Sequence, residues 1–229
     1  MRTLGLIGGI SWESTAHYYT RINQLTAGRL GGLHSARMLM YSVEFDEVQR
    51  LQHADDWKTL GRMFSDIGRR LKQGGAEGLV ICANTMHILA EEVRGATGLP
   101  LIHVVDATAA AAKAAGVDTL ALLGTRFTME KPFYREALER HGLRALLPDE
   151  VERKALHQII FGELCQGVFK PESKDYFYRV VRRLAEAGAG GAILGCTEFT
   201  LIADAAMSPV PLFDTTELHA RAAVDWMIA

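Results

Sequence analysis

The chain has 229 residues, of which 48% are hydrophobic and 23% are charged, a balance typical of one large globular domain or two smaller ones. Lys and Arg number 25 against 27 for Asp and Glu, which gives a formal net charge of −2. The basic pairs Arg69-Arg70 and Arg182-Arg183 are too short to neutralise many phosphates, so we expect no nucleic-acid partner. No apolar run approaches the ~18 residues of a membrane span, and we expect no membrane partner.

The sequence also favours a reducing, cytoplasmic location. Residues Met1-Arg2-Thr3 lead directly into an apolar run that has neither the length nor the cleavage site of a signal peptide. The chain holds three cysteines, and an odd number in a chain of this size argues against a disulfide framework.

In the first half, short apolar runs alternate with stretches of helical period. Residues 4–7 are expected to form a buried strand ending in Gly8-Gly9-Ile10-Ser11, whose serine can cap a helix from Trp12. Further strands are expected at 37–42, 78–81 and 101–104. Asp106 is placed to cap the alanine-rich helix that stops at Gly116.

The same alternation restarts in the second half. Strands are expected at 119–123, which ends in Gly124-Thr125, at 192–194, which closes on Cys196, and at 212–213. A helix over 151–164 would place five apolar side chains on one face: Val151, Ala155, Leu156, Ile159 and Ile160. A later helix, stopped by Gly188, has apolar residues at i, i+3, i+4 and i+7: Phe177, Val180, Val181 and Leu184. This pattern predicts an α/β fold with parallel sheets covered on both faces.

The two halves resemble each other, which indicates an internal duplication. Residues 74–82 are similar to residues 187–196 apart from one inserted residue, and each segment ends in a cysteine. The spacing from Gly8 to Cys82 is 74 positions and that from Gly124 to Cys196 is 72. We therefore predict two similar α/β domains, one of residues 1–104 plus 210–229 carrying Cys82, the other of residues 105–209 carrying Cys196.

Both cysteines are expected where ligands bind. Open parallel sheets bind ligands outside the carboxyl ends of their strands, and a cysteine closes one strand in each half. Cys82 is followed by Asn84 and Thr85, and Cys196 by Thr197 and Glu198, which supply polar groups for a substrate carboxylate. The third cysteine, Cys165, is expected on an amphipathic helix, where it serves packing.

Two thiols that approach one carbon from opposite sides suit the inversion of a stereocentre. This reaction needs a base on one face and an acid on the other, and a thiol with a pKa of ~8.5 is tuned toward either role by its surroundings. Cys82 and Cys196 are therefore candidate acid–base residues.

Other chemistries leave weaker signals. A zinc site of Cys82, His87 and Cys196 lacks closely spaced ligands, and a Cys-His hydrolase lacks an identifiable orienting partner. Gly8-Gly9 is short of a dinucleotide fingerprint, and no P-loop lysine is present. His87, together with His103 and His219, is better explained as structural.

Several motifs carry a family resemblance that covers essentially the whole chain. Residues 80–87 (VICANTMH) and 193–198 (ILGCTE) resemble the two cysteine signatures of the aspartate/glutamate racemase superfamily. Residues 8–15 (GGISWEST) resemble its aspartate racemase branch, and residues 123–129 and 213–220 match in order. Within that branch the chain is most similar to the broad-specificity amino-acid racemases.

The resemblance implies a two-domain enzyme that is independent of pyridoxal phosphate or any other cofactor, is usually homodimeric, and has its active site in the cleft between the domains. It assigns Cys82 and Cys196 as the catalytic acid–base pair acting on a small-molecule amino acid. Asn84, Thr85 and Thr197 would hold the α-carboxylate and α-amino groups. The remaining pocket residues by position are Ile10, Ser11, Gln52, Ala83 and Thr125.

Departures from the family pattern bear on the substrate. Glutamate racemases carry an aspartate where this chain has Ile10, and a histidine where it has Glu198. Strict aspartate racemases present basic groups to the distal carboxylate, whereas Gln52 and residues 163–165 are not basic. Because an unpaired buried carboxylate is costly, we expect a broad specificity. Sister reactions of the superfamily (hydantoin racemisation, maleate isomerisation, malonate decarboxylation) and a non-catalytic amino-acid-binding module stay open as alternatives.

Overall fold

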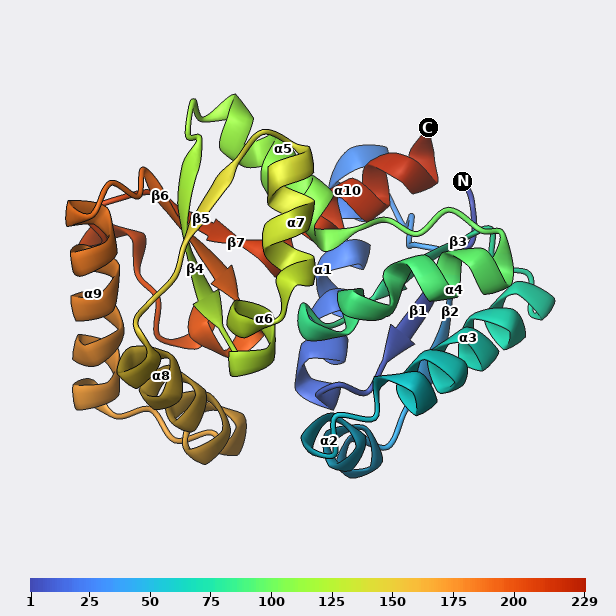
Figure 1. Cartoon of the computed structure of the whole chain (residues 1–229). Helices are drawn as coiled ribbons and strands as arrows, with labels where there is room; N and C mark the ends of the chain where they lie inside the picture. The colour runs from blue at the N-terminus through green and yellow to red at the C-terminus, as the bar shows by residue number, and fades with distance from the viewer. The chain divides into compact units, whose positions relative to one another are not determined.

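The computed structural model describes all residues, 1–229, and divides into two compact units (Figure 1). Unit 1 comprises Met1–His103 with His219–Ala229, and unit 2 comprises Val104–Leu218. Both units are parallel α/β structures, as the alternation of apolar runs and helical periods predicts.

Unit 1 contains a three-stranded parallel sheet in the order β2-β1-β3. Its strands and helices in chain order are β1 (Leu4–Gly8), α1 (Trp12–Leu30), β2 (Met38–Ser42), α2 (Phe45–His53), α3 (Trp57–Gln73), β3 (Gly78–Ile81), the 3₁₀-helix η1 (Thr85–Leu89) and α4 (Ala90–Thr97). The unit is completed by the end of α10 (Thr215–Ile228), from His219 onward.

Helices cover both faces of this sheet. Ile7 of β1 packs in one apolar cluster with Phe64 of α3 and Val93 of α4. Leu6, one position earlier on the strand, packs on the other face with Ile22 of α1 and residues of α10. Successive strand residues point to opposite faces, so β1 has to be apolar throughout, and all of its residues are buried.

Unit 2 contains a four-stranded parallel sheet in the order β5-β4-β6-β7. Its elements in chain order are α5 (Val104–Ala114), β4 (Thr119–Gly124), α6 (Arg126–Glu130), α7 (Pro132–Arg140), β5 (Arg144–Leu146), α8 (Glu150–Gly162), η2 (Leu164–Gln166), α9 (Pro171–Glu186), β6 (Gly191–Gly195), η3 (Thr197–Leu201), η4 (Ala205–Met207), β7 (Leu212–Asp214) and the start of α10. Helices α8 and α9 pack against one face of the sheet, and α5 and α7 against the other (Figure 1).

The two sheets share one topology, which supports the predicted duplication. In each, the first strand of the unit (β1 or β4) lies between the second and the third. Unit 2 adds β7 beside β6, and unit 1 has at the same place a single parallel bridge between Leu79 and Leu101. Cys82 follows β3 and Cys196 follows β6, which are corresponding strands.

Several expectations about individual elements are wrong. Residues 101–104 form only that one bridge, because Val104 already begins α5. Asp106 therefore lies in the first turn of the helix and is not its N-cap. Val151 is 76% exposed, since α8 buries a narrower face made of Leu156, Ile159 and Ile160.

Three further differences concern the second half. Helix α8 ends at Gly162, so Cys165 lies in the short helix η2 and not on the amphipathic helix. Strand β7 pairs with β6 through Ile193 and Phe213, which puts residues 210–218 in unit 2, whereas the predicted boundary gave them to the first domain. The three-residue strand β5 had no counterpart among the expected strands.

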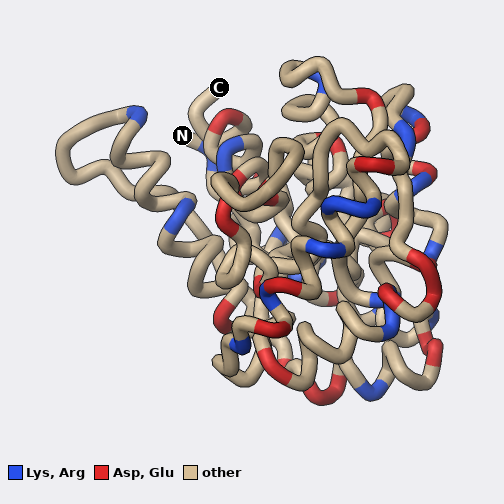
Figure 2. The backbone as a smooth tube through the Cα atoms, turned by 90° about the vertical axis from the view of Figure 1, so that its left-hand side faces the viewer, with Lys and Arg blue, Asp and Glu red and all other residues tan.

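None of the helices combines the length and the apolar character needed to cross a membrane. Basic and acidic residues are interspersed along the backbone trace (Figure 2). Many of them form surface ion pairs, such as Arg50–Asp46 at 2.9 Å on α2 and Arg126–Glu130 at 3.1 Å on α6.

Candidate active site

The loop after β1 is fixed tightly to its surroundings. Gly9 has a φ of +91°, and its amide donates a hydrogen bond of 2.8 Å to Thr15 Oγ1. The carbonyl of Gly8 accepts a 2.9 Å bond from the amide of Val43. Ser11 caps α1 by accepting from the amide of Ser14, as predicted. These contacts fix the backbone on either side of Ile10, which is itself buried.

The loop after β3 leaves the sheet beside the first loop. Because β1 and β3 are parallel neighbours, paired through Ile7 and Ile81, their carboxyl ends lie at one edge. The amide of Cys82 continues the ladder with a 2.9 Å bond to the carbonyl of Ile7. The Cys82 side chain is fully buried on the face covered by α1 and α10.

The segment that follows Cys82 is held by a contact with α2 and by a hydrogen bond within the segment itself. Asn84 and Thr85 are buried, and Gln52 of α2 donates from Nε2 to Met86 Sδ at 3.0 Å. His87 Nδ1 lies 2.8 Å from the carbonyl of Ala83. A carbonyl can only accept, so Nδ1 carries the proton and donates it.

His87 belongs to a cluster of three buried histidines in unit 1. Its ring lies 4.7 Å from that of His103 and 5.2 Å from that of His219 between centroids. His219 Nε2 donates to the carbonyl of Ile102 at 2.8 Å, which leaves Nδ1 to accept from Tyr18 OH at 2.9 Å. Burial and the two neighbouring histidines hold the pKa of His87 well below its ordinary value. His87 is thus neutral at pH 7, and it contacts the Cys82 loop through the carbonyl of Ala83.

Unit 2 repeats the arrangement with different residues. Gly124 ends β4 beside Gly195 at the end of β6, so the loops after both strands start at one edge. Thr125 follows β4, is buried, and caps α6 by accepting from the amide of Thr128. Cys196, which is partly buried, follows β6, and Thr197 begins η3.

Glu198 contacts the thiol of Cys196 directly. Cys196 Sγ donates to Glu198 Oε2 at 2.7 Å, and Thr197 Oγ1 donates to the same oxygen at 2.9 Å. Glu198 is only 9% exposed. From the sequence, Glu198 is a departure from the family pattern and one of the polar residues expected near a substrate carboxylate. Its contact with the thiol was not predicted, although its position two residues after a strand-end cysteine was a usable signal.

Burial raises the pKa of both thiols. For Cys82 burial is the whole cause. For Cys196 burial comes first, followed by the negative charge and the hydrogen bond of Glu198. Both thiols are therefore protonated at neutral pH in the ligand-free protein, and ionising either needs a proton acceptor or a nearby positive charge. Within each unit, no group of three or more His, Cys, Asp or Glu side chains is arranged to hold a metal ion.

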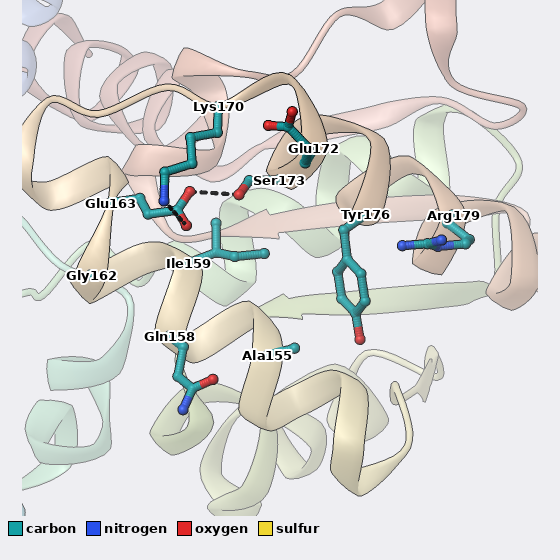
Figure 3. A pocket seen from close by; sticks show the side chains of 10 residues that line it. All are labelled: Ala155, Gln158, Ile159, Gly162, Glu163, Lys170, Glu172, Ser173, Tyr176 and Arg179. Carbon is teal, nitrogen blue, oxygen red and sulfur yellow. Dashed lines mark hydrogen bonds and ion pairs between the residues drawn. The ribbon is translucent and has the colours of Figure 1, made fainter.

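Two surface hollows are lined by neither Cys82 nor Cys196. A groove of about 440 Å³ between α8 and α9 is lined by ten residues, none of them a predicted site residue (Figure 3). Glu163 belongs to the non-basic segment 163–165. In this groove it accepts hydrogen bonds from Lys170 Nζ at 3.1 Å and from Ser173 Oγ at 2.5 Å. The serine and lysine contacts lower the pKa of Glu163.

The second hollow, of about 400 Å³, lies in unit 1 against α1 and the edge strand β2. It is lined by three apolar side chains that are largely exposed, Trp12, Tyr19 and Met40. An exposed apolar patch of this kind beside an unpaired strand edge is typical of an interaction surface.

These features define a class of protein. Each of two parallel α/β units carries a glycine-containing loop beside a cysteine loop with hydroxyl, amide or carboxylate groups, at the sheet edge where α/β enzymes bind their ligands. The sequence matches the Asp/Glu/Hydantoin racemase family over residues 7–223. The chain belongs to this family, as the two cysteine motifs predicted, and it is an isomerase.

Several relatives share the full length of the chain. The broad specificity amino-acid racemase RacX of Bacillus subtilis (strain 168) is 24% identical over 99% of this chain and 98% of its own. A crystal structure of a putative Asp/Glu racemase from Yersinia pestis is 48% identical with a TM-score of 0.95, and covers 100% of both chains. An aspartate racemase homologue from Pyrococcus horikoshii OT3 is 31% identical with a TM-score of 0.88, also over 100% of both chains.

Proposed function

We propose that the protein is an amino-acid racemase that needs no pyridoxal phosphate and exchanges the Cα proton between Cys82 and Cys196. The observation that carries this proposal is the repeated placement of a thiol. Each unit has a cysteine directly after the same strand of the same sheet order, next to a glycine-containing loop. Packing alone gives no reason for a cysteine at both positions, whereas inversion of a stereocentre requires two opposed acid–base groups.

The loops around each thiol supply groups for an amino acid. We propose that Asn84, Thr85 and Thr197 bind the α-carboxylate and α-amino groups. We assign the rest of the pocket to Ile10, Ser11, Gln52, Ala83 and Thr125. Backbone amides, hydroxyls and the Asn84 amide stabilise charge on the carboxylate, and this interaction grows as the Cα proton leaves.

A broad specificity fits the side chains that these loops offer. Gln52 is neutral and already bonded to Met86, and Ile10 is apolar. Neither provides the cation that a distal substrate carboxylate needs in a buried pocket. The full-length similarity to a broad-specificity amino-acid racemase supports the same assignment.

In the proposed reaction, one proton leaves Cα on one face and another proton is added to Cα on the opposite face. The thiolate of one cysteine takes the Cα proton, and the thiol of the other gives its proton to the opposite face, so each cysteine ends in the state in which the other began. Reversal of the reaction exchanges the two roles. Because both thiols are protonated before substrate binds, the positive charge of the substrate ammonium group has to favour ionisation against the effect of burial.

The test uses single-enantiomer amino acids in D₂O, followed by NMR at the α-proton and by chiral analysis of the product. A racemase replaces the α-proton with deuterium and forms the mirror image. Cys82→Ser and Cys196→Ser should each lower turnover by at least ~100-fold in both directions, whereas Cys165→Ser should keep it. Turnover at the wild-type rate in either of the first two variants refutes the two-thiol assignment, and release of CO₂ without racemisation points to a decarboxylase.

Three further properties belong to this proposal. The two units act as the two domains of the enzyme. The protein works as a homodimer, which is supported by the exposed apolar hollow at Trp12, Tyr19 and Met40. It acts in the cytoplasm, where thiols stay reduced, and all three of its cysteines are free.

A further inference from the structure

We propose that Glu198 is the proton partner of Cys196, so that the acid–base group of unit 2 is a thiol–carboxylate pair and not a lone thiol. This inference rests on the proposed function, because it concerns the proton route at one of its two thiols. Glu198 acts through Cys196 and is therefore a positioning and proton-holding residue, distinct from the thiol that meets the substrate.

The contact geometry carries the inference. Glu198 Oε2 is the acceptor of the Cys196 thiol proton at 2.7 Å. Thr197 Oγ1 donates to the same oxygen at 2.9 Å, which holds that oxygen at the sulfur. The backbone amide of Glu198 also faces the sulfur and favours the thiolate. A proton can pass between Sγ and Oε2 without rearrangement of either side chain.

A purely structural role does not explain why this residue is a carboxylate. Glu198 is buried, and a buried carboxylate is costlier to desolvate than an amide of the same shape. A glutamine oxygen would accept the same two hydrogen bonds without that cost. The charge is useful only if the residue takes part in the movement of a proton or in setting the ionisation of Cys196.

The thiol of unit 1 has a different environment. Burial is the sole cause of the raised pKa of Cys82. The residues that follow it on the chain are an alanine, an amide and a hydroxyl, at Ala83, Asn84 and Thr85. The two half-sites therefore share a fold position but differ in proton chemistry, and only the second thiol has a carboxylate as its hydrogen-bond acceptor.

The pair balances protons in both directions. When Cys196 acts as base, its S–H bond breaks and an O–H bond forms on Glu198, so the pair keeps one proton and one negative charge. The thiolate then takes the Cα proton, the pair holds two protons, and Cys82 gives up its own proton and becomes the thiolate. In the reverse direction the doubly protonated pair delivers the Cys196 proton to Cα and the Cys82 thiolate takes the proton from the other face. At no stage does the pair carry two negative charges.

Three influences raise the pKa of Cys196: burial, Glu198 and, last, the thiol of Cys165. Replacement of Glu198 by glutamine removes only the second and keeps the shape of the side chain. The pKa of Cys196 should then fall, because a like charge next to the thiolate has been removed.

The test measures thiol ionisation directly. The rate of alkylation by iodoacetamide is followed across a range of pH values, and peptide mass mapping assigns it to each cysteine. Glu198→Gln should lower the pH midpoint of Cys196 by about one unit or more and leave that of Cys82 unchanged. Glu163→Gln is the matched control: it also removes a hydrogen-bonded carboxylate from unit 2, and it should move neither midpoint. An unchanged midpoint for Cys196 in Glu198→Gln overturns the inference.

A kinetic measurement separates this inference from the proposed function. In an active racemase, Glu198→Gln should lower kcat by about 100-fold with little change in KM, and should move the acid limb of the pH profile to lower pH. If the wild-type protein racemises no amino acid, the proposed function fails while the alkylation result still decides the pairing. A wild-type kcat in Glu198→Gln, with the protein folded by circular dichroism, overturns the role in proton transfer.

Discussion

Replacing Gly9 by alanine should destabilise the protein by about 2–5 kcal/mol, a larger loss than most single substitutions cause. Gly9 has a φ of +91°, and an L-residue in the left-handed region costs roughly 1–2 kcal/mol. An added Cβ would lie 2.3 Å from the carbonyl oxygen and 2.5 Å from the amide nitrogen of Val43. Overpacking of this kind costs about 1–3 kcal/mol, and the two costs add.

The upper part of that range is expected because the opposing atoms belong to a backbone. The amide of Val43 is bonded to the carbonyl of Gly8, and the amide of Gly9 is bonded to Thr15. A shift of Val43 would therefore strain both bonds together with the loop that carries Ile10 and Ser11. Racemase activity should fall in parallel, even at temperatures where the variant is folded.

Gly98 provides a matched control in the same unit. It caps α4 with a φ of +64°, and an added Cβ would meet nothing within 4 Å. Gly98→Ala should therefore cost only the conformational term, about 1 kcal/mol. Urea denaturation followed by circular dichroism gives both free energies of unfolding. The reasoning is wrong if Gly9→Ala loses no more stability than Gly98→Ala.

Two more predictions concern unit 1. In the unfolded chain His87 takes up a proton near pH 6.5, whereas the folded protein keeps it neutral to a much lower pH. The free energy of unfolding is therefore unaffected by His87 above pH ~6.5. Below that pH it falls by up to ~1.4 kcal/mol per pH unit because the unfolded state binds one more proton. Melting temperatures over a pH series should thus depend less on pH in His87→Gln than in the control His34→Gln, which alters an exposed histidine; equal slopes would contradict this. Trp12→Glu should convert a dimer to a monomer in light scattering, whereas Phe169→Glu, an exposed aromatic of unit 2, should not; a dimer that survives Trp12→Glu excludes this hollow as the interface.

The apolar runs determined the fold at the level of the sequence. A strand buried on both faces has to be almost entirely apolar, and residues 4–8, 78–81, 120–124 and 191–195 satisfy this requirement. The glycines and cysteines that close these runs also marked the edge where ligands bind, because parallel strands present their carboxyl ends together. Both features depend on order along the chain, which a sequence contains in full.

Boundaries were less well determined wherever tertiary packing decides between two local solutions. The apolar run 101–104 is as suitable for a strand as for the start of a helix, and only its packing gave Val104 to α5. Val151 has the right period for a buried helix face, but the opposing helix and sheet cover only the narrower face of α8. Strand β7 joins unit 2 because β6 offers it an edge.

The sequence alone identified Cys82 and Cys196 as the candidate acid–base residues, since a strand-end position and a flanking polar motif are local properties. It did not give the proton partner of either. That Glu198 meets the sulfur of Cys196, and that Val43 closes on Gly9, depends on how side chains and neighbouring loops are directed once the sheets have formed. Contacts of this kind are set by distances between atoms in the folded chain, and residue order does not determine them.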